Sequence, residues 1–320
     1  MEALEQAGVD EPRGTDSSAA ERGSQRRASP HLIAVLQALF VTLLWSTSWV
    51  LIKIGLADIP ALTFAGLRYT LAFLALLPFL LRPSNIDSIR QLSKRDWLQL
   101  ATLGLLFYTV TQGAQFLGLD FLPAVTVSLL LNFTSVIITL MGIVLLAEVP
   151  NLRQWSGVIL AALGGLLYFY PVALLAAQTI GVVIVIAGVL ANSASAVLGR
   201  SINRSGRIQP LTVTMVSMGI GSLLLLISGL FVQGLPQLSL ASWAIIVWLA
   251  VVNTALAFTL WNHTLRSLSA MESSVINNTM LIQIAVLAWI FLGERLSGQE
   301  IAGLTVAALG TLLVQLRRNA

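Results

Sequence analysis

The chain has 320 residues, of which 57% are apolar and only 10% are charged, and its mean hydropathy is +0.87. A soluble domain carries about a quarter charged residues, so this composition excludes an ordinary soluble protein. The chain has no cysteine, which excludes disulfides, thiolate nucleophiles and cysteine-based metal sites.

The first 29 residues differ from the rest of the chain. They are polar and contain neither an apolar segment nor a cleavage site, so they are not a secretory signal. Their Ser, Gly, Ala and mixed charges predict a disordered cytoplasmic tail over residues 1–29.

Beyond the tail, the charges are confined to short stretches that separate long apolar runs. Each run matches the roughly 20 residues that a helix needs to cross a hydrocarbon core about 30 Å thick. No run alternates polar and apolar residues with a period of two, which excludes a membrane β-barrel. The sequence therefore predicts an all-α integral membrane protein with ten transmembrane helices. They are expected at 32–53, 61–81, 97–118, 122–147, 152–171, 178–200, 211–233, 241–264, 270–292 and 298–316.

The basic residues indicate the orientation of these helices, because cytoplasmic loops are enriched in Lys and Arg. With a cytoplasmic N-terminus, 15 of the 18 basic residues fall in cytoplasmic segments. Only Lys53 and Arg295 face outward, and Arg68 lies inside the membrane. An odd number of helices would spoil this sorting, so we expect both termini in the cytoplasm and the protein in the plasma (inner) membrane. The enrichment of basic residues in the predicted cytoplasmic segments also accounts for the net charge of +4, so this charge does not indicate a nucleic-acid partner.

The sequence contains an internal repeat, which appears when the chain is shifted by 146 residues against itself. The repeat predicts two five-helix units, over residues 30–172 and 173–318. Because five is odd, the second unit must enter the membrane upside down. Inverted repeats of this kind are common in secondary transporters, whose substrate site lies at the midplane between the halves. The informative matches are Ser128 with Ser274, Asn132 with Asn278, Glu148 with Glu294, Gly157 with Gly303, and Gly164 with Gly310.

Several motifs resemble those of a known family. They are LLWSTSWVLIKIGL in the first helix, PALTFAGLRYTLAFLALLP in the second, and the paired joints LLAEVPNLRQWSGVILAALGG and FLGERLSGQEIAGLTVAALGT. Together they resemble the EamA-type members of the drug/metabolite transporter superfamily over residues 32–316. The resemblance implies two inverted five-helix repeats and the export of amino acids, metabolites or drugs.

Arg68 is the charged residue that the sequence places inside a span. The helical rise puts it about 12 Å along the second helix. A charge at the bilayer centre costs on the order of 2.5–3.5 kcal/mol on insertion scales, so it is a functional hypothesis by default. In one interpretation, Arg68 has a function: it contacts an anionic group or carboxylate of the solute, or it belongs to a gate. In the other, it snorkels or pairs with helix-end carbonyls.

Asn132 and Asn278 hold equivalent positions near the middle of their helices. A buried amide needs hydrogen-bond partners, which a solute can supply. The alternative interpretation is helix–helix contact, a common use of Asn in membranes.

Further polar and aromatic residues complete the predicted cavity lining. Trp45 and Trp49 share one face of the first helix, and Trp45 lies too deep for an interfacial belt. The remaining candidates for substrate contact are Ser48, Gln112, Gln115 and Asn192.

Two residues near the ends of helices are not expected to bind substrate. Lys53 ends the first helix near the outer face, where snorkelling costs little. Glu294, like Glu148, precedes a helix and is expected to favour the positive end of that helix, as a structural or gating residue.

The sequence lacks the motifs of other classes. It has no GxxxxGK[ST], HExxH or GxSxG motif, so ATP-driven, metalloprotease and hydrolase chemistry lack their residues. No carboxylate lies in the middle of a predicted helix, so the usual acidic proton relay is missing as well.

We therefore interpret the chain as a secondary transporter, most simply an exporter, of small metabolites, amino-acid-like or drug-like solutes, working by alternating access. We expect no enzyme activity, no metal and no other cofactor. The expected partners are a small solute and the lipid bilayer, while proton or other ion coupling and the oligomeric state stay open. The alternative function is a non-transporting membrane scaffold or sensor, although the chain contains no soluble domain that would serve it.

Overall fold

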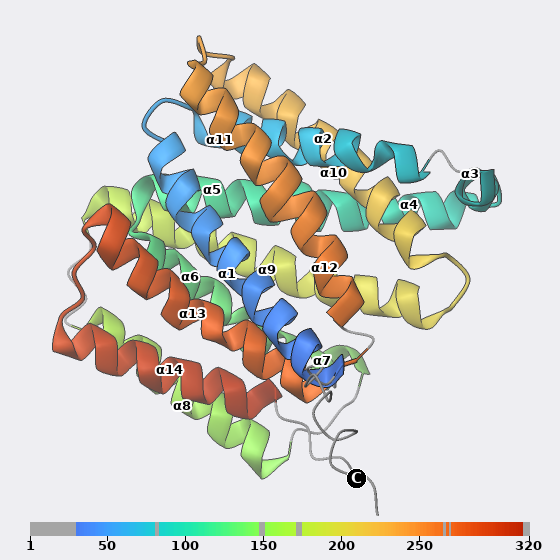
Figure 1. Ribbon diagram of the computed structural model, residues 1–320. Coiled ribbons are helices and arrows are strands. Elements are labelled where there is room, and N and C mark those ends of the chain that lie inside the picture. Colours follow the sequence, from blue (N-terminus) through green and yellow to red (C-terminus); the bar gives the residue numbers. More distant parts are fainter. Residues whose placement is uncertain are drawn as a thin grey trace, which may run out of the picture.

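The computed structural model describes residues 30–80, 83–146, 151–170, 175–264, 267–268 and 270–315. Within these ranges the chain consists of helices, turns and short connecting segments, and no strand occurs among them. Figure 1 shows long helices packed side by side. The predicted tail over residues 1–29 and the predicted role of Glu148 lie outside the described residues.

The described part of the first half contains nine helical elements. Three of them, α4, η1 and α5, form a continuous rod, because the backbone stays right-handed helical at both junctions. The elements are α1 (Pro30–Gly55), α2 (Ala61–Leu80), α3 (Pro83–Arg90), α4 (Lys94–Gly104), the π-helix η1 (Leu105–Thr111), α5 (Gln112–Phe121), α6 (Ala124–Asn132), α7 (Thr134–Leu146) and α8 (Leu152–Phe169).

The second half repeats this order with fewer interruptions. A second π-helix, η2, again continues the helix before it and the helix after it. The elements are α9 (Ala176–Arg204), α10 (Pro210–Gln233), α11 (Leu240–Ala250), η2 (Val251–Leu256), α12 (Ala257–Thr264), α13 (Ala270–Leu292) and α14 (Gly298–Gln315).

Short polar motifs fix where several of these helices begin. Ser93 accepts a hydrogen bond from the backbone of Asp96 at the start of α4, and Ser239 accepts one from Ser242 at the start of α11. The two caps are 146 residues apart, so the repeat extends to the capping residues. Each cap satisfies a backbone N–H that has no partner within its helix.

Eight helical segments in the described part of the chain are long and apolar enough to cross a membrane. The protein is therefore a multi-pass integral membrane protein. The prediction of ten spans is confirmed only in part, because α14 is apolar but shorter and the rod from α4 to α5 is not among the eight. The eight are His31–Gly55, Ala61–Phe79, Ala124–Met141, Leu152–Phe169, Ala176–Asn203, Pro210–Gln233, Leu240–Trp261 and Val275–Leu292.

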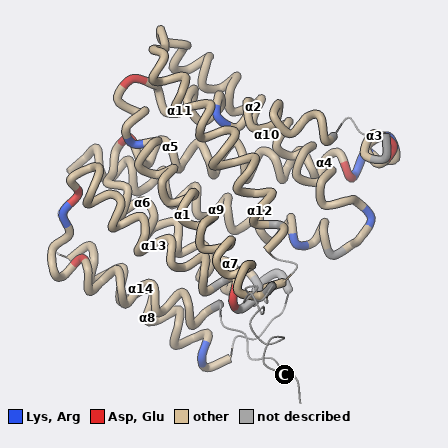
Figure 2. Tube along the Cα trace, in the orientation of Figure 1, with Lys and Arg blue, Asp and Glu red and all other residues tan. Residues whose placement is uncertain are grey.

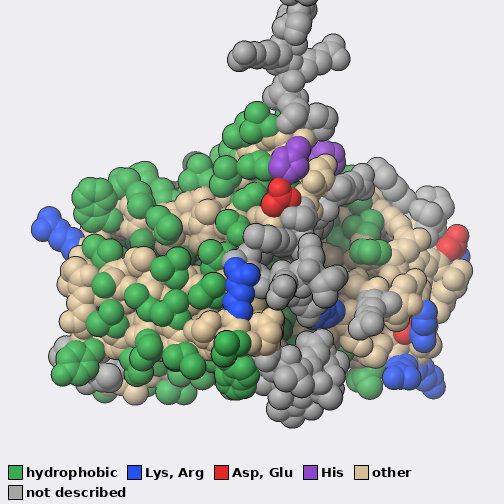
Figure 3. Space-filling model, turned by 90° about the horizontal axis from the view of Figure 1, so that it is seen from below, with side chains coloured by type: hydrophobic (Ala, Val, Ile, Leu, Met, Phe, Trp, Pro, Cys, Tyr) green, Lys and Arg blue, Asp and Glu red, His purple; other side chains and the backbone are tan. Residues whose placement is uncertain are grey.

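The surface matches a lipid environment. Large apolar side chains are widely exposed, among them Phe231 at 91% and Leu240 at 87%. Figure 3 shows apolar side chains spread over the face seen from below, and Figure 2 shows Lys, Arg, Asp and Glu mostly near helix ends and connecting segments. In water such a surface would be unfavourable, whereas lipid tails solvate it.

Helices α8 and α14, which are equivalent in the two predicted repeats, pack closely against each other. Gly157 faces Gly310, and Gly164 faces Gly303, so the two helices run in opposite directions. A Cβ built on Gly157 would lie 2.8 Å from the carbonyl oxygen of Gly310, and one on Gly164 would overlap the backbone nitrogen of Ala307. Only glycine allows the two backbones to approach this closely.

The equivalent helices α2 and α10 show the same relationship. Gly66 of α2 faces the backbone of Leu226, and Gly229 of α10 faces the backbone of Thr63. The order of these contacts is again reversed along the two helices, so α2 and α10 are antiparallel. Equivalent elements of the two halves therefore meet in opposite orientations in two separate places.

Candidate functional site

The π-helices η1 and η2 occupy equivalent positions in the two halves. η1 begins at Leu105 and η2 begins at Val251, which is 146 residues later. A π-segment widens a helix by inserting an extra residue, and such segments are frequent at functional sites. In η2, the hydroxyl of Thr254 donates to the carbonyl oxygen of Leu249, five residues earlier, at 2.8 Å. Thr254 can therefore only accept a hydrogen bond from any further partner.

That partner is Arg68. Its Nε donates to Thr254 Oγ1 at 3.2 Å, which links α2 in the first half to η2 in the second. The Arg68 side chain is only 5% exposed, and its guanidinium carbon lies 5.1 Å from the ring centre of Tyr69 and 5.9 Å from that of Phe116. No acidic residue in the described part of the chain pairs with it. Arg68 therefore does not snorkel to the surface, and it is a buried cation without a counterion.

Of the two predicted glutamines of α5, Gln112 is linked to this cation. Gln112, at the start of α5, accepts a hydrogen bond from the hydroxyl of Tyr69 at 2.6 Å and is 8% exposed. Gln115 is half-buried one turn later, and its side chain makes no hydrogen bond within the described ranges. The structure thus joins Gln112 to Arg68 through Tyr69.

Asn132 lies at an interruption that the sequence did not predict. The expected single helix over 122–147 has a one-residue break at Phe133, between α6 and α7, where the backbone stays right-handed helical. The Asn132 Oδ1 atom is buried and has no hydrogen-bond partner among the described residues.

The region around this break contains a second predicted residue. Asn192 of α9 donates to the hydroxyl of Thr134 at 3.3 Å, immediately after the break. Ser193 also reaches the Thr134 carbonyl, at 3.5 Å. Asn278 is half-buried on α13, and no hydrogen bond joins it to Asn132.

The predicted cluster on α1 is divided between packing and hydrogen bonding. Trp45 is half-buried, and its ring centre lies 5.4 Å from that of Phe258 and 5.2 Å from that of Trp261. Trp49 is 8% exposed within the main hydrophobic core. Ser48 donates to the backbone carbonyl of Trp45, so its hydroxyl hydrogen is already used.

Two polar contacts between helices involve residues outside the predicted set. Ser46 of α1 donates to Gln283 Oε1 of α13 at 2.9 Å. The fully buried Asn253 donates to the hydroxyl of Thr47 at 3.1 Å and to the carbonyl of Leu44, while its Oδ1 has no partner. Asn253 could have been noticed, since it is an amide inside an otherwise apolar run, whereas Tyr69 and Thr254 carry no such signal.

The turn between α5 and α6 is held from both sides by charged residues. Lys53 Nζ donates to the carbonyls of Leu119 and, at 3.0 Å, Leu122, where α5 ends. Glu294 accepts from the backbone N–H groups of Ala124 at 2.7 Å and Val125 at 3.2 Å, where α6 begins. The expectation that Glu294 serves the following helix is therefore wrong. A capping box of Ser297 and Glu300 begins α14 instead, as its hydrogen bonds show.

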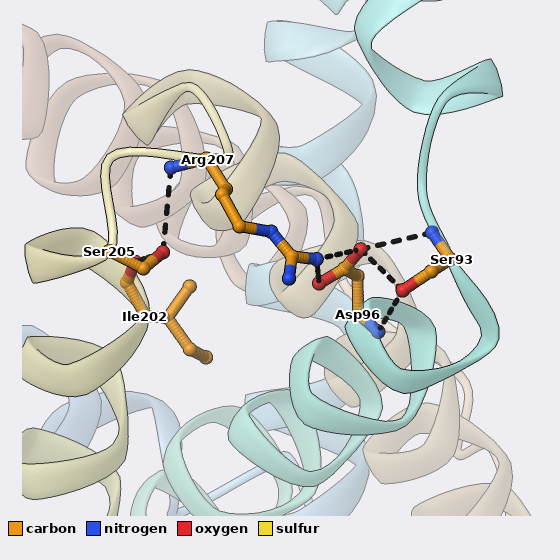
Figure 4. A network of polar contacts seen from close by, with 5 residues as sticks. All are labelled: Ser93, Asp96, Ile202, Ser205 and Arg207. Atoms are coloured by element: carbon orange, nitrogen blue, oxygen red, sulfur yellow. Dashed lines mark hydrogen bonds and ion pairs between the residues drawn. The ribbon is translucent and has the colours of Figure 1, made fainter.

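A second polar network lies at the start of α4 (Figure 4). Arg207 Nη2 donates to both carboxylate oxygens of Asp96, at 2.6 and 2.7 Å, and thereby ties the α9–α10 connection to α4. Ser93 donates to the same carboxylate through its hydroxyl at 2.6 Å and its backbone N–H at 3.0 Å. These hydrogen bonds, together with the charge of Arg207, lower the pKa of Asp96.

A cavity of about 430 Å³ lies beside the α5–α6 turn and the start of α14. It contains none of the nine residues that the sequence predicts for substrate contact. Its wall includes three aromatic rings and one carboxylate. It is lined by Leu122, Pro123, Thr126, Tyr168, Phe169, Tyr170, Gln178, Ser297, Gln299 and Glu300.

Known proteins with similar sequences are transporters by name. The uncharacterized transporter YvbV of Bacillus subtilis (strain 168) is 29% identical over 307 residues, which cover 91% of this chain and 94% of that protein. A protein of Salmonella typhimurium (strain LT2) named "probable amino-acid metabolite efflux pump" is 25% identical over 288 residues, covering 85% and 91% of the two chains.

A known crystal structure shares the fold. It superposes with a TM-score of 0.62 at 17% sequence identity and covers 88% of this chain and 96% of its own. The model of the EamA-like transporter family matches this chain twice, over residues 32–170 and 179–316, and the two matches fit a two-repeat architecture. The chain therefore belongs to the EamA-like transporter family.

Proposed function

We propose that this protein is a secondary transporter that exports small metabolites, amino-acid-like or drug-like solutes, by alternating access. Its two halves would be inverted five-helix repeats over residues 30–172 and 173–318, with ten spanning helices in all. The antiparallel packing of α8 with α14 and of α2 with α10 supports this arrangement, because equivalent helices of inverted repeats must run in opposite directions.

The observation that carries the proposal is the buried, unpaired Arg68. It lies on α2 and reaches Thr254 of the other half, so it marks the boundary between the two repeats. Removing a cation from water without a counterion is costly, and folding alone does not require it. Binding of a solute to the guanidinium during transport would explain why a buried charge is present despite this cost in free energy.

Other predicted residues extend the proposed site. Gln112, Gln115 and Asn132 have amide groups that are not fully used by the described protein. We assign them, with Asn192 and Asn278, to the lining of the path between the halves. Trp45, Ser48 and Trp49 shape the α1 side of that path.

Export is the direction that we favour. The named function of the Salmonella relative is the efflux of amino-acid metabolites, and the absence of a GxxxxGK[ST] motif leaves transport to be driven by gradients. The scaffold or sensor alternative has no comparable support, because the relatives are named as transporters and the polar groups around Arg68 are incompletely paired.

The deciding experiment is transport by the purified protein in liposomes. The panel contains amino acids, organic acids, amines and drug-like cations, each tested with imposed pH and voltage gradients. We expect saturable, protein-dependent flux of at least one class and loss of that flux in Arg68→Gln. A folded protein that moves no member of the panel would support the scaffold or sensor alternative.

The orientation needs a separate test, and the lack of native cysteine makes single-cysteine labelling free of background. We propose an inner-membrane location with both termini in the cytoplasm. Gln178→Cys and Gln237→Cys should then react with an impermeant maleimide in intact cells, whereas Ser205→Cys should react only after the cells are opened. Labelling of Ser205→Cys in sealed cells would contradict the proposed topology.

A further inference from the structure

The groups around Arg68 offer more hydrogen-bond donors than acceptors. An arginine carries five N–H donors, and in the described part of the chain only the one on Nε has an acceptor, Thr254 Oγ1. The Oε1 atom of Gln112 accepts from the Tyr69 hydroxyl, and the amide nitrogen of Gln112 has no acceptor among the described residues. An ionised carboxylate, which has acceptors and no donors, complements such a set.

The chain offers no comparable partner for a positive charge. None of its 14 acidic residues lies in the middle of a predicted span. Two of the carboxylates near the ends of spans are already used, since Glu294 binds the first N–H groups of α6 and Asp96 binds Arg207. An ammonium group carried to Arg68 would therefore be buried beside a like charge and without a counterion.

We infer that the transported solute is an organic monoanion with an apolar body, in preference to a zwitterion or a cation. This inference rests on the transporter function proposed above and defines its substrate class. The anionic group binds the free N–H groups of Arg68 and Gln112. The apolar body packs beside the rings of Tyr69 and Phe116, which already flank the guanidinium.

Thr254 acts as a positioning residue for this contact. Its hydroxyl hydrogen is committed to the Leu249 carbonyl, so its oxygen presents lone pairs to Arg68 Nε. The bond fixes one edge of the planar guanidinium and leaves the opposite edge for a bidentate anion. Because Thr254 belongs to the second half and Arg68 to the first, a movement between the halves changes the direction in which Arg68 presents its free edge.

A monoanion also removes the need for a proton relay. The inside-negative membrane potential drives an anion outward, and a potential of 100 mV supports a concentration ratio of roughly 50-fold at equilibrium. Export of a monoanion through this site can therefore run without a coupled proton. This agrees with the absence of a carboxylate from the middle of every predicted span.

The test uses three solutes that share one body and differ in charge: 3-phenylpropanoate, phenylalanine and 2-phenylethylamine. The full chain is reconstituted in liposomes, and efflux is measured at pH 8 with a potassium-diffusion potential, using protein-free liposomes as the baseline. We expect 3-phenylpropanoate to leave at least about tenfold faster than the other two, which corresponds to about 1.4 kcal/mol of discrimination. An inside-negative potential should accelerate its efflux, and a pH gradient should not.

Variants assign this selectivity to the site. Arg68→Gln should abolish the saturable efflux of 3-phenylpropanoate, and Arg68→Lys should retain part of it. Thr254→Val should raise KM for the anion, whereas Thr254→Ser keeps the hydroxyl and should behave like the parent. Arg200→Gln, which removes an exposed arginine from α9, is the control and should leave efflux unchanged.

Melting temperatures separate this role from a structural one. Because Arg68 is buried without a counterion, Arg68→Gln should melt at or above the temperature of the parent. A lowered melting temperature with parent-like efflux would show a structural arginine and overturn the inference. Faster efflux of phenylalanine or 2-phenylethylamine than of the anion would also overturn it, while leaving the transporter function intact. If the parent moves neither these solutes nor any member of the wider panel, the proposed function itself fails.

Discussion

Lys53 and Glu294 bind opposite sides of one short turn, although they are far apart in sequence. Lys53 neutralises the carbonyl end of α5, and Glu294 neutralises the amide end of α6. Each charge therefore meets the helix dipole of opposite sign. Because Glu294 follows α13 in the second half, the turn ties the two halves together at the end of the molecule that we propose faces outward.

Opening of the outer side should begin at this turn. Replacing Glu294 with Ala removes the acceptors of two N–H groups, which costs about 0.5–2 kcal/mol when a helix cap is lost. We expect Glu294→Ala to melt at a lower temperature and to increase the labelling of a cysteine at Thr126 by an impermeant maleimide. Thr126 is only 7% exposed in the parent, so faster labelling reports opening of the adjoining cavity.

The control for this experiment is Asp58→Ala. Asp58 is an exposed acidic residue in the connection between α1 and α2, at the same end of the molecule, and makes no side-chain hydrogen bond within the described ranges. Its removal should change neither the melting temperature nor the labelling of Thr126→Cys. Equal labelling in Glu294→Ala and Asp58→Ala would mean that Glu294 does not close this side.

Asn132 should be more important for transport than for stability. Its Oδ1 atom is buried without a partner, and an unsatisfied buried polar atom costs about 1–3 kcal/mol. Asn132→Ala should therefore leave the melting temperature unchanged or raise it, while the initial rate of transport falls. Both quantities are measured on the same preparations in detergent and in liposomes.

Asn192→Ala provides the comparison for Asn132. Asn192 donates to Thr134, and a hydrogen bond between membrane helices is worth about 0.6 kcal/mol on average. Its removal should lower the melting temperature slightly. The cavity interpretation of Asn132 fails if Asn132→Ala melts lower than the parent and transports normally.

The contact between α8 and α14 should tolerate no added methyl group. Gly164→Ala and Gly310→Ala each place a Cβ against the backbone of the opposite helix, and overpacking costs about 1–3 kcal/mol. We expect lower melting temperatures and lower yields of folded protein. Gly298→Ala is the matched control, since nothing lies within 4 Å of a Cβ at that position. Parent-like melting of both core variants would show that the helices separate easily at these residues.

The hydrogen bonds that Ser93 and Arg207 donate to Asp96 should make stability depend on pH. The pKa of Asp96 is lowered in the folded state, from an ordinary value of about 3.9. A carboxyl group whose pKa is lower in the folded state stabilises the fold at a pH above its pKa in the unfolded state. This stabilisation is lost as the pH falls through its pKa in the folded state. Asp96→Asn should therefore melt below the parent at pH 7, and the difference should shrink below about pH 4.

Asp87→Asn is the comparison for this measurement. Asp87 lies 4.0 Å from Arg90, and both side chains are more than half exposed, so their pairing contributes little. The Asp87→Asn variant should have the same melting temperature as the parent at every pH tested. A difference between Asp96→Asn and the parent that stays constant down to pH 3 would contradict the assignment to the Asp96 carboxylate.

The positions of most helices could be predicted because a bilayer constrains length and apolar composition. The helix expected at 270–292 is α13 with the same bounds, and the one expected at 211–233 begins only one residue earlier. The break at Phe133 could not be predicted in this way, since apolar residues continue on both sides of it. Side-chain contacts from α9 to Thr134 accompany the break, and a local pattern does not contain them.

The same limit applies to the candidate site. Arg68 could be identified from sequence because a charge is rare inside a span. Its partner Thr254 lies 186 residues away, in a π-helix whose composition is that of an ordinary apolar helix. Glu294 likewise binds a helix 170 residues earlier, not the one that follows it. Pairings of this kind depend on which helices cross and at what depth.

The packing of α8 against α14 has the form of a symmetric dimer interface. Gly157 meets Gly310, and their counterparts in the opposite halves, Gly303 and Gly164, meet each other in turn. In a homodimer this reciprocity follows from two-fold symmetry, because both subunits use the same surface patch in the interface. Here both patches belong to one chain, so a single folded chain supplies both sides of such an interface.

Two repeats within one chain, unlike the two copies in a homodimer, need not have identical sequences. When Pro60 is aligned with Pro210, Arg68 corresponds to Met218, which is buried and uncharged. A true dimer would carry the arginine in both of its copies. Among the described residues, Arg68 is the one basic side chain that is buried in this way, and the proposed second repeat has no counterpart to it.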